Sequence, residues 1–234
     1  MLHLLRFRNE KWSKSFCSEL ISPEFHDSFK NSLNFTTGRQ AISYLCHHLK
    51  LNPGDKCLIP AYVAEGVIAP LKDFGLKIIF YSLKENLVPK EDSTIQILEA
   101  HPDAMLMFII HPFGRIININ STKIKKVAPR IKIVADYALS FFSGKERIQK
   151  KSLLHDSSLF SFNKFFPCND GACLIQHSAS DVFTRITFPP TNPDIIQAAS
   201  THLAANSKLF NEKYKQENID FVLNSYECYY KKIN

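Results

Sequence analysis

The sequence contains little glycine and no paired cysteines. Its 234 residues include only 7 glycines, against 12 prolines and 19 phenylalanines. A glycine beside a predicted strand or at a helix start is therefore more informative here than in most chains. The six cysteines form no C-x-x-C pair, which argues against both a zinc site and a disulfide framework. We expect free, buried thiols.

Long apolar runs are also missing. No stretch approaches the ~18 apolar residues that a membrane span needs, and the opening MLHLLR lacks the apolar core of a signal peptide. The sequence therefore predicts a cytoplasmic protein with no membrane partner. Three common motifs are absent as well: G-x-G-x-x-G, the P-loop pattern and G-x-S-x-G.

Positive charge is in excess. The chain has 29 Lys and Arg against 22 Asp and Glu, a net charge of +7, which suits anionic ligands such as phosphates or nucleotides. The basic residues are scattered and form no recognisable nucleic-acid module, so nucleic acid is not an expected partner. His47 and His48 point about 100° apart on a predicted helix. They cannot chelate from one face, and we expect no metal site.

Strand-like and helix-like segments alternate along the middle of the chain. Near-continuous apolar runs separated by helices are typical of a buried, mainly parallel sheet. The expected fold class is therefore α/β, with three α/β/α layers and a mixed, mainly parallel sheet. The predicted strands are at 57–59, 77–81, 105–110, 131–135, 159–162 and 172–175, and the predicted helices are at 38–49, 63–74 and 122–130.

A change in composition near residue 189 indicates the domain organisation. The run PPTNP at 189–193 is a stiff linker, because proline fixes the backbone. A mainly helical pattern follows it. We expect an N-terminal helical segment at 1–34, a main domain at 35–188, and a linker with a helical tail at 189–234.

Two segments at the expected rim of the sheet could bind a ligand. Thr37 and Gly38 open a predicted helix, whose exposed N–H groups and positive dipole end suit an anion. A simple threonine N-cap is the alternative. Tyr62 follows the strand at 57–59, at the edge where open α/β sheets bind ligands. It is either a stacking platform or a packing residue.

Asp136 and Lys164 each follow an apolar strand. A buried carboxylate is costly unless it pairs with a cation or several donors. The protonated pyridine nitrogen of pyridoxal phosphate is such a cation, and a helix cap or loop carboxylate is the alternative for Asp136. Lys164 stands among apolar residues, where desolvation would lower its pKa, as an amine that forms Schiff bases requires. Otherwise its amine reaches solvent.

Five short motifs occur in order along about residues 35–176. They are TGRQA at 37–41, IPAY at 59–62, IHPFG at 110–114, ADYA at 135–138, and FSFNK at 160–164 with DGA at 170–172. Taken together, they resemble the sugar-nucleotide aminotransferase family (DegT/StrS type). Members of this family are fold type I enzymes that depend on pyridoxal phosphate.

The resemblance implies a role for each candidate residue. Tyr62 would stack on the pyridine ring of the cofactor, Asp136 would pair with its nitrogen, and Lys164 would form a Schiff base with it and move protons. The groups that would hold the cofactor phosphate are the backbone at Thr37, Gly38 and Arg39 and the hydroxyl of Ser161. The implied reaction moves an amino group, commonly from glutamate, to a keto-sugar nucleotide. The implied assembly is a homodimer.

Several positions depart from the family pattern. The family lysine usually lies at the place of Phe166, although Lys164 keeps the expected distance to the motif at 170–172. Leu139 replaces the usual Gln or His, and the chain stops where family members continue into a small C-terminal domain. The alternative function is therefore a catalytically impaired protein with the aminotransferase fold, which acts as a binding or partner subunit.

Overall fold

The computed structural model describes residues 32–149, 155–165 and 171–177, together with Thr201 and Asn224. The elements named below all belong to one unit of the chain, Leu20–Phe165 with Asp170–Thr184. The predicted tail at 189–234, apart from Thr201 and Asn224, lies outside the described residues. So does the predicted N-terminal segment, apart from residues 32–34. The proposed domain boundaries therefore stay predictions.

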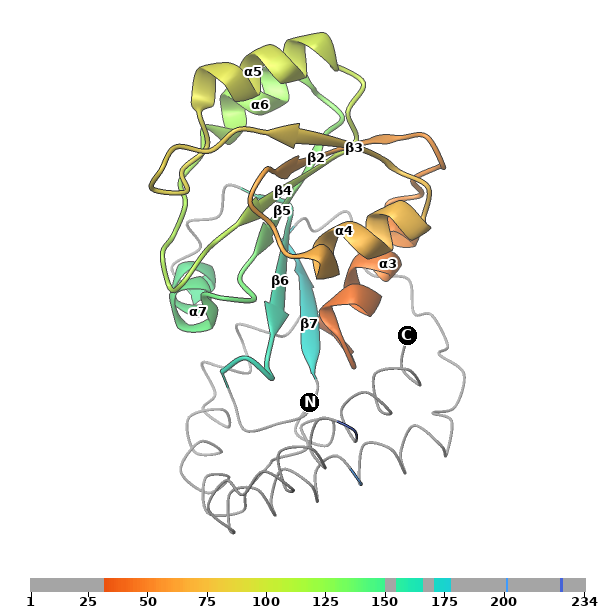
Figure 1. Ribbon diagram of the computed structural model, residues 1–234, viewed down its shortest axis with the longest axis vertical. Helices are drawn as coiled ribbons and strands as arrows, with labels where there is room; N and C mark the ends of the chain where they lie inside the picture. The colour runs from red at the N-terminus through yellow and green to blue at the C-terminus, as the bar shows by residue number, and fades with distance from the viewer. Residues whose placement is uncertain (1–31, 150–154, 166–170, 178–200, 202–223, 225–234) are drawn as a thin grey trace. The chain divides into compact units, whose positions relative to one another are not determined.

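Seven strands of the described residues form one sheet in the order β1-β7-β6-β5-β4-β2-β3 (Figure 1). The strands are β1 (Ser32–Phe35), β2 (Lys56–Pro60), β3 (Lys77–Tyr81), β4 (Leu106–Ile110), β5 (Lys132–Asp136), β6 (Ser157–Ser161) and β7 (Ala172–Gln176). β7 runs antiparallel to both of its neighbours, and the other pairings are parallel. The predicted mixed, mainly parallel sheet is confirmed.

Helices cover both faces of this sheet. Helices α3 (Gly38–His48) and α4 (Glu65–Asp73) pack on one face, and α5 (Glu91–Ala100) and α6 (Ser121–Val127) pack on the other. Strand β2 shows the alternation that separates the two cores. Cys57 and Ile59 belong to the core under α3 and α4, whereas Leu58 between them belongs to the core under α5 and α6. The three predicted layers are confirmed.

Helix α7 (Phe141–Gln149) packs on the sheet through aromatic rings. The ring of Phe141 lies 5.5 Å from that of Phe160, and the ring of Tyr137 stacks on Phe160 at 5.1 Å. Gly144 lets the helix approach these rings, because a Cβ atom there would lie 2.5 Å from the Tyr137 ring. This close packing also fixes the end of strand β5, because Tyr137 directly follows Asp136 in the chain.

The observed elements match the predicted ones in kind. All six predicted strands and all three predicted helices form, with ends that shift by up to three residues. Strand β1 and helices α5 and α7 were not predicted. Gly75 follows α4 with φ +88°, a conformation that glycine adopts without strain.

The cysteines of the described residues behave as the composition predicts. Cys46, Cys57 and Cys173 are free and buried. Burial raises the pKa of the Cys46 thiol to about 12 and the pKa values of the other two well above their usual range. These thiols are therefore inert packing groups. Within the described residues, no helix is both long enough and apolar enough to span a membrane.

A half-buried histidine pair, His155 and His177, lies at the amino end of β6. The hydroxyl of Ser158 lies 2.7 Å from Nε2 of His155 and 2.7 Å from Nε2 of His177. One hydroxyl proton can be donated to only one of these rings, so the other ring donates to the hydroxyl oxygen. Burial lowers the pKa of His177 to about 4, and the nearby carboxylate of Asp156 opposes this shift. Burial thus favours the neutral form of the His177 ring.

Replacing Gly144 by alanine should destabilise the protein. The added Cβ would lie 2.5 Å from the Tyr137 ring and 2.9 Å from the Phe160 ring, and such overpacking costs about 1–3 kcal/mol. The matched control is Gly66→Ala in α4, where the nearest atom, Nε of Arg39, lies at an ordinary 3.5 Å. Urea unfolding measures both. A Gly144→Ala protein as stable as Gly66→Ala would contradict the packing of α7.

The free energy of unfolding should decrease as the pH is lowered, because His177 titrates. Its folded-state pKa of about 4 lies below the ~6.5 of an unfolded histidine, so the unfolded chain binds more protons between these values. The contribution is complete above pH ~6.5 and is lost towards pH ~4, amounting to roughly 3 kcal/mol. Measured by urea unfolding at several pH values, His177→Gln should lose less stability in acid than the natural protein. The same change at exposed His47 should not alter the pH dependence.

Candidate functional site

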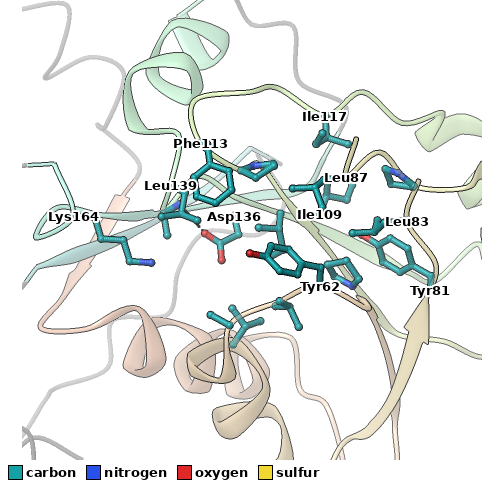
Figure 2. Close-up of a pocket in the computed structure, with 18 residues that line it drawn as sticks. Tyr62, Tyr81, Leu83, Leu87, Ile109, Phe113, Ile117, Asp136, Leu139 and Lys164 are labelled. Carbon is teal, nitrogen blue, oxygen red and sulfur yellow. Dashed lines mark hydrogen bonds between the residues drawn. The ribbon is translucent and has the colours of Figure 1, made fainter. Parts of the chain in front are cut away.

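The carboxyl ends of the parallel strands frame a pocket of about 260 Å³ (Figure 2). Its lining comes from the ends of β2, β3, β4 and β5 and from the turns that follow them, with Lys164 from beyond β6. Asp136 and Lys164 are the charged side chains of this lining, and most of the others are apolar. A largely apolar pocket with a few polar groups is typical of a small-molecule site.

Asp136 is the last residue of β5 and is only 4% exposed. Its Oδ1 accepts a hydrogen bond from the backbone N–H of Ala138 at 2.7 Å. Burial raises the pKa of this carboxyl, while the Ala138 hydrogen bond and the positive charge of Lys164 act in the opposite direction. A buried carboxylate with so little compensation favours a cationic ligand beside it.

Lys164 lies in the turn that follows β6, in which the N–H of Phe165 donates to the carbonyl of Phe162 at 3.0 Å. The side chain is exposed, which agrees with the second of the two possibilities considered, in which the amine reaches solvent, and not with burial among its apolar neighbours. It nevertheless lines the pocket together with Asp136, and Figure 2 shows both side chains on the same side of the lined space. Phe166, the other position considered for the lysine, lies outside the described residues.

Tyr62 follows β2 at the rim of the pocket. The backbone just before it is fixed to the next strand, because the N–H of Ala61 donates to the carbonyl of Tyr81 at 2.9 Å. Its ring is 62% exposed and lines the pocket. Such an exposed ring can serve as a stacking surface for a ligand, which was one of the two roles considered for it.

The predicted anion-binding residues lie at the adjacent end of the same edge. Phe35 and Ser161 both pair with Ala172, from β1 and β6 respectively, so the start of α3 and the end of β6 flank the same strand. The carbonyl of Thr36 accepts the N–H of Gly171 at 2.7 Å. The sheet therefore brings the helix start and Ser161 to one edge, although neither lines the pocket itself.

The start of α3 shows how these residues are held. Thr37 is the N-cap, and its Oγ1 accepts the N–H of Gln40 at 3.3 Å, so the N-cap interpretation is confirmed. Space is open around Gly38, where an added Cβ would meet no atom within 4 Å. Nε of Arg39 lies near Gly66 of α4, 3.5 Å from where a Cβ atom would be. The hydroxyl of Ser161 donates to Oδ1 of Asn163 at 2.8 Å.

The turn after β4 contains the motif at 110–114, to which the sequence assigned no role in the site. The buried His111 accepts the N–H of Ile117 at Nδ1, 3.0 Å away, and its ring stacks on Tyr137 at 4.3 Å. Phe113 has a positive φ of 49° and a ring that is 73% exposed. Its place beside Gly114 within a motif was the available signal for such a turn.

A second group missed from the sequence lies further along the pocket, where Leu83, Leu87 and Ile117 join the lining. Leu139, which departs from the family pattern, lines the pocket with an apolar side chain. Among the described residues, no group of three or more histidine, cysteine or acidic side chains could hold a metal ion.

Comparisons with known proteins give matches in structure only. No family model matches the sequence, and no curated protein matches it. Solved structures that resemble it include GDP-4-keto-6-deoxymannose-3-dehydratase (ColD) with bound GDP-perosamine, at 14% identity and a TM-score of 0.53, covering 76% of this chain and 52% of that chain. The fold is that of type I pyridoxal-phosphate enzymes.

Two further structures agree. NtdA from Bacillus subtilis with bound cofactor PMP is 16% identical with a TM-score of 0.55, covering 76% of this chain and 44% of that chain. The aminotransferase TlmJ from Streptoalloteichus hindustanus is 14% identical with a TM-score of 0.54, covering 76% and 54%. The chain thus spans about half the length of the structures that it matches. These identities establish the fold, so the chemistry depends on the residues of the pocket.

Replacing Asp136 by asparagine should stabilise the ligand-free protein. Because burial raises the pKa of Asp136, the folded state binds protons more readily than the unfolded state, and ionisation at neutral pH works against folding. Asparagine keeps an oxygen for the Ala138 N–H without the charge. Urea unfolding at pH 7 should show a gain on the order of 1 kcal/mol. A loss of stability would mean that the carboxylate is better compensated than its contacts indicate.

Proposed function

We propose that this protein is a pyridoxal-phosphate-dependent aminotransferase that moves an amino group, from glutamate, to a keto-sugar nucleotide. The observation that carries the proposal is the presence of Asp136 and Lys164 in the lining of one pocket, at the carboxyl edge of a sheet with the type I fold. Asp136 ends strand β5, and Lys164 lies in the turn after the neighbouring strand β6. Each supplies a group that this cofactor requires.

The residues present fit pyridoxal phosphate. Among the described residues, Lys164 is the cation whose charge acts on the buried carboxylate of Asp136, and a protonated pyridine nitrogen would supply a second positive charge. Lys164 offers a primary amine at the pocket. The first N–H groups of α3 have no partner within the helix, so the backbone of Thr37, Gly38 and Arg39 can donate to a phosphate, with the hydroxyl of Ser161 close by.

When bound, this cofactor supplies an electron sink that stabilises negative charge on the carbon next to the reacting nitrogen. The negative charge of Asp136 would keep the ring nitrogen protonated, because two charges interact more strongly in a buried site than in water. The amine of Lys164 would hold the cofactor covalently and, when released, take up and return a proton at the reacting carbon. Tyr62 would cover one face of the ring and exclude water from it.

Net charge and one matched structure support the proposed substrate class. The chain carries a net charge of +7, which suits a phosphate-rich substrate, and one matched structure holds GDP-perosamine. The resemblance of the five motifs to the DegT/StrS family also supports a nucleotide-linked sugar, a homodimer and a cytoplasmic location. These assignments belong to the proposal, because the chain spans only about half of the matched proteins.

Absorbance and trapping test the proposal directly. Protein mixed with pyridoxal phosphate should turn yellow, and borohydride should then leave the cofactor attached to Lys164, as peptide mass spectrometry can show. Lys164→Ala should lose most of this attachment, since Lys164 is the lysine that lines the pocket in the described part of the chain. The control is Lys56→Ala, whose amine is paired with Asp103 at 2.8 Å at the start of β2, and it should label normally.

Turnover separates the two functions considered for the chain. Glutamate added to the loaded protein should be converted to 2-oxoglutarate in about one equivalent per site, and Lys164→Ala should abolish this conversion. Cofactor attachment without any conversion would reject the aminotransferase and favour a binding subunit. A colourless protein that shows no attachment at Lys164 would reject the cofactor as well.

A further inference from the structure

The pocket has two chemically different ends. The strand order β6-β5-β4-β2-β3 places Lys164 and Asp136 at one end of the edge and the residues after β3 at the other, with Tyr62 between them (Figure 2). Three strand spacings, about 14 Å in all, separate β5 from β3. One six-membered ring beside Asp136 is too short to fill both ends.

The end beside β3, called the apolar end here, consists of Tyr81, Leu83, Leu87, Pro89 and Ile117. Tyr81 is its sole polar side chain, and the hydroxyl of Tyr81 already donates to the carbonyl of Phe108 at 2.8 Å in a buried position. The five side chains therefore present hydrocarbon to the pocket. A hydroxyl-rich group placed there would lose its hydrogen bonds to water without replacement, which is unfavourable.

The hairpin that carries Leu87 is held firmly. The N–H of Lys84 donates to the carbonyl of Val88 at 2.8 Å, and the N–H of Leu87 donates to the carbonyl of Lys84 at 2.9 Å. Residues Leu83 and Pro89 form an antiparallel bridge across the hairpin. Leu87 itself has a φ of +62°. Leucine rarely adopts this backbone conformation, and here it accompanies a side chain that lines the pocket.

Phe113 is held in the same unusual way on the facing turn, with a φ of +49°. A hydrogen bond of 2.8 Å from Nη1 of Arg115 to the carbonyl of Asn86 ties this turn to the hairpin. Of the three non-glycine residues with positive φ in the described part of the chain, two line this pocket, and the third is Lys50. Each such residue costs about 1–2 kcal/mol, and strain of this kind concentrates at binding sites.

We infer that the apolar end is a binding subsite for a hydrocarbon group of the substrate. The inference rests on the proposed function, in which the amine or carbonyl carbon of the same molecule lies beside Lys164. The substrate class is therefore an amino or carbonyl compound with an alkyl or similarly apolar substituent directed along the sheet edge towards β3. Polar parts of the substrate, including any nucleotide, lie outside this end of the pocket.

Binding of unbranched alcohols from propanol to heptanol tests the subsite without the cofactor. Titrations of the full chain, followed by NMR of its leucine and isoleucine methyl groups, give a dissociation constant for each alcohol. Each added methylene should strengthen binding about threefold to fourfold while the subsite fills. Leu87→Asn should remove most of this gain for the longer alcohols, because it places an amide in the apolar end. Asparagine also tolerates the positive φ.

The matched control is Lys50→Asn, which makes the same change at the third positive-φ position and should keep the chain-length dependence. A flat series in the natural protein would overturn the inference, and so would a steep series that Leu87→Asn leaves unchanged. Neither result depends on cofactor binding. Loss of the yellow colour and of attachment at Lys164 would reject the proposed function, while the alcohol series would still report on the subsite.

Discussion

The buried carboxylate of Asp136 constrains the rest of the site. It stands at the end of the central strand β5 with 4% of its surface exposed and one backbone N–H donor on Oδ1. Burial penalises its charge, as the raised pKa shows. A carboxylate in this position is tolerated when positive charge lies near it. Lys164 provides some of that charge from the turn after the neighbouring strand β6, and a cationic ligand can provide more. The function therefore has to be sought at this edge of the sheet.

Aromatic packing behind Asp136 fixes where its carboxylate points. The ring of Tyr137, the next residue, is stacked between His111 at 4.3 Å and Phe160 at 5.1 Å. The carbonyl of Asp136 also accepts the N–H of His111 at 3.0 Å. The rings come from strands on both sides of β5, so the backbone at residues 136 and 137 cannot rotate without disturbing the packing. Such rigid support is what a preorganised site requires.

Local patterns in the sequence predicted the central sheet because its strands are apolar on both faces, as in Cys57, Leu58 and Ile59. They did not predict β1, which is four residues long and depends on its pairing with β7, more than a hundred residues away. Helix α7 was not predicted either, because Gly144 and Ser143 lower its helix propensity and its packing against distant aromatic rings compensates.

The sequence singled out the two charged residues of the pocket, Asp136 and Lys164, because a charged side chain directly after an apolar strand is easy to recognise. The apolar end escaped notice, because leucine and isoleucine residues near a strand look like core until the topology shows that they line a pocket.

The pairing of β1 with β7 has a consequence for the order of folding. Among the described strands, β1 pairs with β7 alone, so a ribosome must add more than a hundred further residues before β1 can join the sheet. Contacts between such distant segments form late, because closing a long loop costs entropy before the contact repays it. The helix start at Gly38 directly follows β1. The start of α3, for which we propose phosphate binding, therefore takes its place at the sheet edge only when β1 has paired with β7. A partly synthesised chain would not yet have this site.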